Sequence, residues 1–191
     1  MSDRNTIIRG LHDLGLAAWF GGSLMGAVGL NAAAGVVDDP KQRGRVANAG
    51  WDAWTPVNAA AIGAHLVGAV GLLAANRDRV LNQHGVGLSS AVKTALTGIS
   101  LGLTAYSRVA GQKVSNAGDV PIESGTEPNS QTPTDVAKAQ DQLRALQWAI
   151  PASTGLLLLV SALQGEQQRP DEQARGRLGK AAQRLSRNQS H

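Results

Sequence analysis

Histidine is the residue type in this chain best suited to binding a metal or moving a proton. Four are present: His12, His65, His84 and His191. His65 lies eleven residues before Asn76, the end of an uncharged stretch, and as a helical residue it would sit roughly 16 Å deep. His12 precedes another such stretch, so we expect it at the surface, too far from His65 to share a metal ion or a haem. His12 and His84 could meet at that surface, but two imidazoles without a third ligand make a poor metal site.

The same counting predicts a layer of polar side chains at the depth of His65. Its members are Ser23, Thr97, Ser153 and Thr154. One interpretation is a neutral His65 that is hydrogen-bonded inside the protein. The other is a proton relay, ligand site or haem site, with His65 and then His12 as the candidate cofactor-binding residues. Asn31 and Asn58 are predicted at similar heights nearer the other end, where an interhelical hydrogen bond is expected.

The chain carries no recognisable catalytic motif. It has no cysteine, which excludes disulfides, thiolate metal sites and cysteine nucleophiles. It has no GxSxG, no phosphate loop and no pair of acids within an uncharged stretch. The glycine-rich segment GLAAWFGGSLMG follows no strand pattern, so it is not a dinucleotide fingerprint. The sequence therefore leans against an enzyme and predicts no cofactor, with haem or metal binding through His65 as the alternative.

Four stretches with few charges must position these residues. Residues 14–37 and 53–76 each give 24 positions without an acid, Lys or Arg, and residues 145–165 give 21. A shorter stretch, 94–107, extends back to residue 85 if Lys93 is tolerated. About 20 helical residues cross the ~30 Å hydrocarbon core of a bilayer. We therefore predict an all-α bundle of four transmembrane helices, with spans at about 14–37, 53–76, 87–107 and 145–165.

Glycine content favours this prediction over a soluble four-helix bundle. The first stretch holds six glycines, and at roughly 1 kcal/mol each they would cost a helix in water about as much as a whole domain's stability. In lipid, glycines are tolerated and let helices approach closely. The pairs Gly22/Gly26 and Gly98/Gly102 are accordingly predicted helix contacts.

The third span is the weakest of the four. Its seven favourable apolar residues are offset by Lys93, which costs about 2.5 to 3.5 kcal/mol at a span centre. If the span begins near Ser89, Lys93 can extend its ammonium group to the headgroups. The alternatives are a cation buried in the bundle and a re-entrant or surface segment.

Two segments outside the spans are strongly polar. Residues 108–144 are predicted as a long disordered outer loop, with the fourth helix starting near Pro133 after an N-cap at Thr132 and entering the membrane near residue 145. Residues 166–191 form a basic tail. A weak helical stripe there predicts attraction to anionic lipid, a solvated tail being the alternative. The five basic residues predicted to contact the lipid surface are Arg175, Arg177, Lys180, Arg184 and Arg187.

The distribution of Lys and Arg predicts the orientation. With four spans, residues 1–13 and the tail share one side, which carries 10 Lys and Arg against 7 on the other. This bias favours both termini in the cytoplasm of a multi-pass bacterial membrane protein. Trp51, Trp54 and Trp148 fall at the outer ends of their spans, where indoles prefer the interface. The basic residues flank the membrane without interleaved aromatics, so nucleic acid is not an expected partner.

The segment from His12 to Gly22, HDLGLAAWFGG, resembles the H-x6-W-x-G-G first-helix pattern of copper resistance D-like bacterial membrane proteins and of related four-helix, in part actinobacterial, families of uncharacterised function. The resemblance implies a compact bundle in the bacterial plasma membrane, with metal or haem handling. This chain has no Cys and only Met1 and Met25, whereas Cu(I) needs thiolate or thioether ligands. The resemblance therefore provides no copper route.

The leading hypothesis is a non-enzymatic, four-span membrane protein that acts through helix packing and through contacts with lipids, a second copy or another membrane protein. The alternative is a membrane redox, haem- or metal-binding or transport protein that uses His65 and its polar neighbours.

Overall fold

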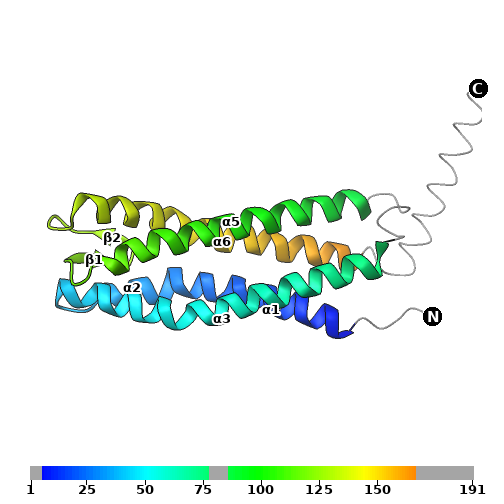
Figure 1. The fold of residues 1–191 in the computed structure, drawn as a ribbon, viewed down its shortest axis with the longest axis horizontal. Coiled ribbons are helices and arrows are strands. Elements are labelled where there is room, and N and C mark those ends of the chain that lie inside the picture. The colour runs from blue at the N-terminus through cyan, green and yellow to red at the C-terminus, as the bar shows by residue number, and fades with distance from the viewer. Residues whose placement is uncertain (1–5, 78–85, 167–191) are drawn as a thin grey trace, which may run out of the picture.

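Four long helical segments lie side by side along one axis (Figure 1). The structure is a computed structural model and describes residues 6–77 and 86–166. The first segment comprises α1 (Thr6–Met25), one π-helical turn η1 (Gly26–Leu30) and α2 (Asn31–Gly35). The other three are α3 (Pro40–Ala75), α5 (Val86–Asn116) and α6 (Thr134–Glu166). The first residues of α1 and the last residues of α6 lie at the same end of the molecule (Figure 1).

Local sequence explains where two helices begin. Asp39 caps α3 by accepting a hydrogen bond from the backbone N–H of Lys41 at 3.0 Å, and Pro40 occupies the first helical position. The first turn of α6 is closed by the N–H of Ala137, which donates to the carbonyl of Pro133. The predicted N-cap at Thr132 is wrong, because its hydroxyl accepts from the backbone N–H of Asn129, which precedes the helix, at 2.9 Å. The same hydroxyl donates to the carbonyl of Pro121 at 2.6 Å.

Three of the described helices are long and apolar enough to cross a membrane. They cover Thr6–Gly35, Pro40–Ala75 and Thr134–Gly165. α5 does not reach that level of hydropathy, in line with the weakness expected of the span that contains Lys93. The chain is thus mostly helical, with three membrane-span-like helices and a more polar fourth.

The helices pack as two pairs. α1 runs along α3, α5 runs along α6, and α1 also contacts α6, whereas α3 and α5 share few contacts. The fully buried apolar core is small, with Leu16, Trp19 and Leu157 at its centre. Many large aliphatic side chains instead lie on the outside; they include Leu14, Val28, Val57, Val67, Val70, Leu88, Ile99, Leu156, Leu159 and Leu163. So many exposed aliphatic side chains are typical of a surface that lipid or a partner covers.

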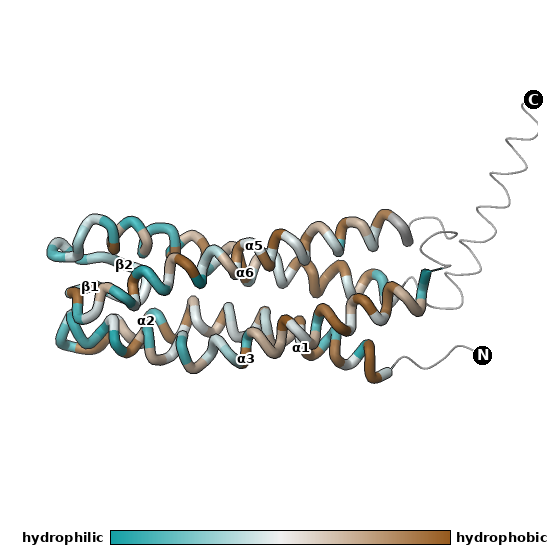
Figure 2. Tube along the Cα trace, viewed as in Figure 1, coloured by the Kyte–Doolittle hydropathy of each residue, from teal (hydrophilic) through white to brown (hydrophobic). Residues whose placement is uncertain are grey.

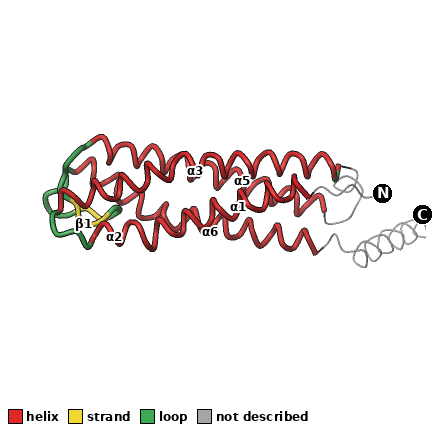
Figure 3. The backbone as a smooth tube through the Cα atoms, turned by 90° about the horizontal axis from the view of Figure 1, so that it is seen from below, coloured by secondary structure: helices red, strands yellow, loops and turns green. Residues whose placement is uncertain are grey.

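The prediction of a disordered loop over residues 108–144 is wrong. α5 continues to Asn116, and a short antiparallel hairpin, β1 (Ile122–Ser124) with β2 (Glu127–Pro128), precedes α6. α6 begins at Thr134, which confirms the predicted helix start near Pro133. The hairpin covers one end of the helices (Figure 3).

Specific contacts hold this hairpin in place. Ile122 is 2% exposed. The buried Gln140 side chain donates to the carbonyl of Ser124 at 3.1 Å, and Arg43 pairs with the Glu123 carboxylate at 3.1 Å. Gly, Pro, Ser, Thr and Asn are common both in packed turns and in disordered loops. Composition alone therefore could not distinguish this hairpin from a disordered segment.

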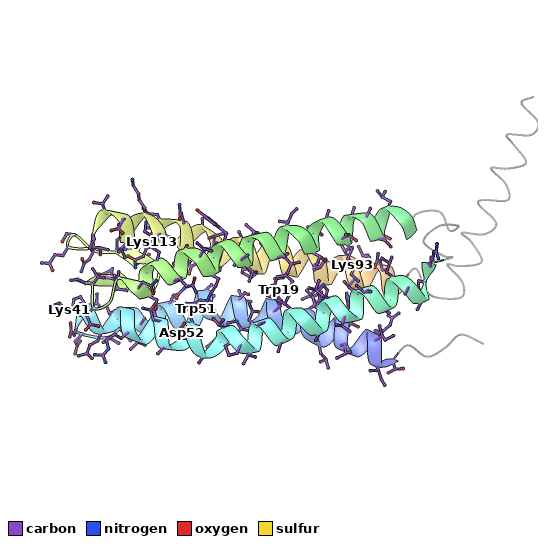
Figure 4. The ribbon with its side chains drawn as sticks, in the orientation of Figure 1. Trp19, Lys41, Trp51, Asp52, Lys93 and Lys113 are labelled. Carbon is purple, nitrogen blue, oxygen red and sulfur yellow. The ribbon has the colours of Figure 1, made fainter. Side chains whose placement is uncertain are left out.

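Polar residues gather at the hairpin end of the molecule. Hydropathy changes along the helices, from mostly hydrophilic at that end to mostly hydrophobic over the rest (Figure 2). Lys41 and Lys113 lie toward the hairpin end, whereas Lys93 lies toward the opposite end (Figure 4). Long helices therefore combine an apolar portion with a polar extension.

Candidate binding site

His12 and His65 are in contact, so the predicted surface position of His12 is wrong. Their ring centroids are 4.5 Å apart, and the two side chains are 1% and 0% exposed. The prediction counted depth from residue 14, the first uncharged position, but α1 begins eight residues earlier, at Thr6. Charged residues near a helix end therefore gave a poor estimate of where the helix begins.

The hydrogen bonds of the two imidazoles indicate their tautomers. His65 donates from Nδ1 to the backbone carbonyl of His12 at 3.2 Å, and His12 donates from Nδ1 to the Asp13 carboxylate at 2.6 Å. With Nδ1 as donor, each neutral ring keeps an acceptor lone pair on Nε2. Neither Nε2 has a hydrogen-bond partner within the described part of the chain, although both are buried.

Two glycines allow this close approach of α1 and α3. A Cβ at Gly15 would lie 2.6 Å from the backbone nitrogen of His65, and one at Gly68 would lie 2.6 Å from the Cα of His12. Each histidine thus faces a glycine on the opposite helix. Trp19, two turns beyond His12, is fully buried and donates from Nε1 to the Thr104 hydroxyl at 3.1 Å. The H-x6-W spacing therefore places both aromatic rings on the buried face of α1.

These residues do not fit a haem held between the two histidines. Their rings are already in contact, and the helix backbones beside them leave no room for a methyl group. A metal ion would find two imidazole nitrogens, because residues 6–77 and 86–166 hold no group of three or more His, Cys, Asp or Glu side chains. That donor set is smaller than a protein metal site normally uses.

The expected polar layer is mostly satisfied within individual helices. The hydroxyls of Ser23, Thr97 and Thr154 each donate to a carbonyl one turn earlier in their own helix. Only Ser153 joins two helices, by accepting a hydrogen bond from Ser100 of α5 at 2.9 Å. Ser100, which is fully buried, was missed by the sequence analysis, although its position three residues after Thr97 could have suggested it.

The two predicted glycine pairs lie in different surroundings. Gly22 of α1 and Gly26 of η1 face the indoles of Trp54 and Trp51 of α3, so closely that no Cβ would fit. A Cβ at Gly98 or Gly102 of α5 would meet nothing within 4 Å in the described structure. Among the described residues, nothing therefore packs closely against the α5 pair.

A cavity of about 330 Å³ lies where α3 and α5 separate. Its walls come from α1, α3, α5 and α6, and the hairpin turn closes one end. Apolar residues and a few polar ones line it; among them are Ile62, Leu101, Ile150, Asn58, Trp54 and Gln147. Its volume is at the lower end of the range for small-molecule pockets.

A hydrogen-bonded network forms the hairpin end of the cavity. Asn31 donates to Gln147 of α6 at 2.8 Å and accepts from the indole N–H of Trp51 at 2.9 Å. Gly125 in the hairpin turn lies directly against the Asn31 side chain. The predicted Asn31–Asn58 bond is absent from the described contacts, since the partners of Asn31 are Gln147 and Trp51. The network joins three helices. Its members bond to one another, so its role is to form one end of the cavity wall.

Two polar groups in the cavity wall have no hydrogen-bond partner among the described residues. They are the indole N–H of Trp54 and the amide oxygen of Asn58, both buried and both on α3. The cavity also has one ion pair, Arg108 of α5 with Asp52 of α3 at 3.2 Å, and both side chains are partly exposed. This pair bridges two helices that share few contacts (Asp52 is labelled in Figure 4).

Several predicted residues lie outside the described part of the chain. These are His84, His191 and the five basic tail residues Arg175, Arg177, Lys180, Arg184 and Arg187. The cavity itself had no signal in the sequence, because its walls come from five elements. The resemblance of residues 12–22 to copper resistance D-like proteins stays a prediction. Comparison with protein-family models, with curated proteins and with solved structures finds no match to this chain.

Proposed function

We propose that this chain is a four-span, non-enzymatic membrane protein that holds a small molecule in the cavity between α3 and α5. The observation that carries the proposal is a mostly apolar cavity of about 330 Å³, which a self-satisfied polar network closes at one end. Convergent polar groups in a mostly apolar pocket are typical of ligand sites. We assign His12 and His65 a role in packing α1 against α3.

The innermost charges of three helices support a membrane boundary at the level of the cavity. Asp52 of α3 and Arg108 of α5 are at one level, because they form an ion pair. From residue 53 to the end of α3 at Ala75 the chain spans about 34 Å, and residues 145–165 of α6 span about 31 Å. Both lengths match the ~30 Å core of a bilayer. Trp51 and Trp54 then lie in the interface, the preferred depth of indoles.

α5 crosses the same layer in this proposal. Residues 94–107 alone span about 21 Å, so a crossing of about 30 Å includes Lys93 within the layer. Lys93 is only partly buried and acts electrostatically on both His12 and His65, as Asp13 of α1 does. A lysine at that depth can extend its ammonium group to the headgroups.

The orientation and partners follow from the charge bias along the sequence. Both termini face the cytoplasm, the hairpin lies outside, and the basic tail contacts anionic lipid. The exposed face of α5 around Gly98 and Gly102 is available to lipid, a second copy or another membrane protein.

Two single-cysteine variants test the membrane arrangement, since the natural chain has no cysteine. In carbonate-washed membranes the protein stays in the pellet. In intact cells, a membrane-impermeant maleimide labels Asp119→Cys in the hairpin segment, whereas Glu166→Cys at the end of α6 is labelled only after lysis. A protein in the supernatant, or the reverse labelling, contradicts the proposal.

Native mass spectrometry tests the binding role. Protein released from its own membranes should carry an additional bound mass. Ala105→Phe, which places a ring in the cavity wall, should lose that mass. The matched control is Ala95→Phe, an exposed position of α5 outside the cavity, which should retain it. Equal retention in both variants contradicts the proposal.

A further inference from the structure

We infer that the ligand of this cavity is a membrane lipid with a zwitterionic head group. One hydrocarbon chain of the lipid lies in the cavity, while its phosphate and ammonium groups pair with Arg108 and Asp52. This inference rests on the proposed function and names its ligand class. It is carried by the order of side chains along the two cavity walls and by the accessibility of the ion pair between them.

The cavity walls of α3 and α5 show the same order of chemical character. Lining residues recur every three or four positions on each helix, which is the spacing of one helix face. From the hairpin end inward, the walls include Asn48, Asp52 and Ile62 of α3 and Ser115, Arg108 and Leu101 of α5. Both walls therefore change from polar through charged to apolar in one direction, which is also the direction in which hydropathy rises along the helices (Figure 2). An amphiphilic ligand has the same order from its head to its chain.

The ion pair offers a head group two accessible partners. Arg108 donates one N–H to the Asp52 carboxylate at 3.2 Å, and neither side chain has another hydrogen bond among the described residues. The two side chains are 42% and 56% exposed. A guanidinium has five N–H donors, and a carboxylate accepts several hydrogen bonds. Both groups can therefore bind a ligand while they stay paired with each other.

The two charges favour a head group that carries both signs. A phosphate oxygen accepts from the remaining N–H groups of Arg108, since guanidinium groups match phosphate well. The ammonium group of the same head donates to Asp52. An anionic head would leave Asp52 facing a like charge, and a cationic head would do the same to Arg108. These two are the ionisable side chains that line the cavity in the described part of the chain.

The apolar part of the cavity has the shape of a chain site. Ile62 lies ten residues beyond Asp52, and Leu101 lies seven before Arg108, so this part extends about 10–15 Å along the helices. The cavity of about 330 Å³ also continues toward the hairpin, so it is narrow, which favours a linear chain over a ring system.

The location of the ion pair favours a ligand from the bilayer. The pair lies at the proposed membrane boundary, and lipid head groups occupy the layer just outside the hydrocarbon core. α3 and α5 share few contacts, so a chain can enter between them while its head stays at the level of the pair.

Native mass spectrometry of the full chain in detergent with added lipid tests the inference. Zwitterionic phosphatidylethanolamine and anionic phosphatidylglycerol are supplied with identical chains, so that they differ in the head alone. Because the basic tail is proposed to attract anionic lipid, only the cavity share of the binding is compared. That share is the binding which Ala59→Phe, in the cavity wall, removes and Ala60→Phe, an exposed position outside it, retains.

The cavity should bind phosphatidylethanolamine at least about tenfold more tightly than phosphatidylglycerol, as expected for one charge-assisted hydrogen bond. Glycerophosphoethanolamine, the same head without chains, should not be retained. Asp52→Asn removes the partner of the ammonium group and keeps Arg108, so it should reverse the preference. The matched control is Asp135→Asn, whose carboxylate pairs with Lys113 at 3.9 Å outside the cavity wall; it should keep the wild-type preference.

Three results would overturn the inference. These are a cavity that binds the anionic lipid as tightly as the zwitterionic one, an Asp52→Asn protein that keeps the wild-type preference, or a head without chains that binds as tightly as the lipid. If Ala105→Phe loses a naturally bound mass but the cavity does not prefer the zwitterionic lipid, the ligand class is wrong and the proposed binding role stands. A protein without any bound mass that depends on the cavity would contradict the proposed function instead.

Discussion

Replacing Gly68 with alanine should separate α1 from α3 at the histidine contact. The added Cβ would lie 2.6 Å from the Cα of His12. That atom belongs to a helix backbone and cannot rotate away, so the helices must move apart to reach ordinary contact distance. Gly63→Ala on the same helix is the matched control, because its Cβ would meet nothing within 4 Å.

The size of the effect follows from comparing the two variants. Alanine is favoured over glycine in a helix by up to about 1 kcal/mol, and this gain is common to both. Only Gly68→Ala adds overpacking, which typically costs 1–3 kcal/mol. For a chain of this length, roughly 2–4 °C of Tm accompanies each kcal/mol. With a cost of about 2 kcal/mol, the middle of that range, we expect Gly68→Ala to unfold at a temperature about 4–8 °C below that of Gly63→Ala.

Circular dichroism at 222 nm during heating, in one detergent for all variants, measures this difference. Gly15→Ala should behave like Gly68→Ala, since its Cβ would meet the backbone at His65. The double variant should lose less than the sum of the two, because one separation of the helices relieves both clashes. A Gly68→Ala protein as stable as Gly63→Ala, or fully additive losses, would refute a tight α1–α3 contact.

Three further predictions concern the hairpin, the network and the membrane. Ile122→Ala should destabilise the protein by about 2–5 kcal/mol and open residues 117–133 to proteolysis, because this side chain anchors the hairpin; an unchanged digestion pattern would contradict that role. Gln147→Leu removes the acceptor of Asn31 and should lower the free energy of unfolding by about 1–3 kcal/mol, measured in the same melts; no loss would mean that the network is not needed for stability. Brominated lipids should quench the fluorescence of a protein that keeps only Trp148 and spare one that keeps only Trp19, since these residues are 52% and 0% exposed; equal quenching would argue against lipid at the exposed surface.

Composition and charge spacing predicted that the helices exist better than they predicted which residues of neighbouring helices lie at the same level along the bundle. Uncharged stretches near 20 residues indicated helices that could span a membrane, and the structure has three such helices. The height of His12 was misjudged because α1 includes Arg9 and Asp13 before the apolar part begins. An uncharged stretch indicates which residues could lie in a bilayer. The heights at which residues of two helices meet also depend on where each helix begins, which the uncharged stretch does not show.

The polar hairpin and the cavity were harder to predict for a different reason. Ile122 is buried by contacts with α3, and Gln140 bonds to backbone carbonyls 13 and 16 residues away. Such bonds leave no periodic pattern in the sequence. The cavity likewise depends on what α5 does not contact, which composition cannot indicate.

The position of the cavity can be explained by which glycines lie in close contact with a neighbouring helix. In the first helical segment, Gly15 faces the backbone of α3, and Gly22 and Gly26 face its indoles, so this helix contact is tight along its length. On α5, Gly98, Gly102 and Gly111 meet nothing within 4 Å in the described structure. Glycines favour helix association only where a partner lies against them, so α3 is held on the α1 side and separated from α5. The space left between α3 and α5 is then bridged by the Asp52–Arg108 pair and open to a small molecule.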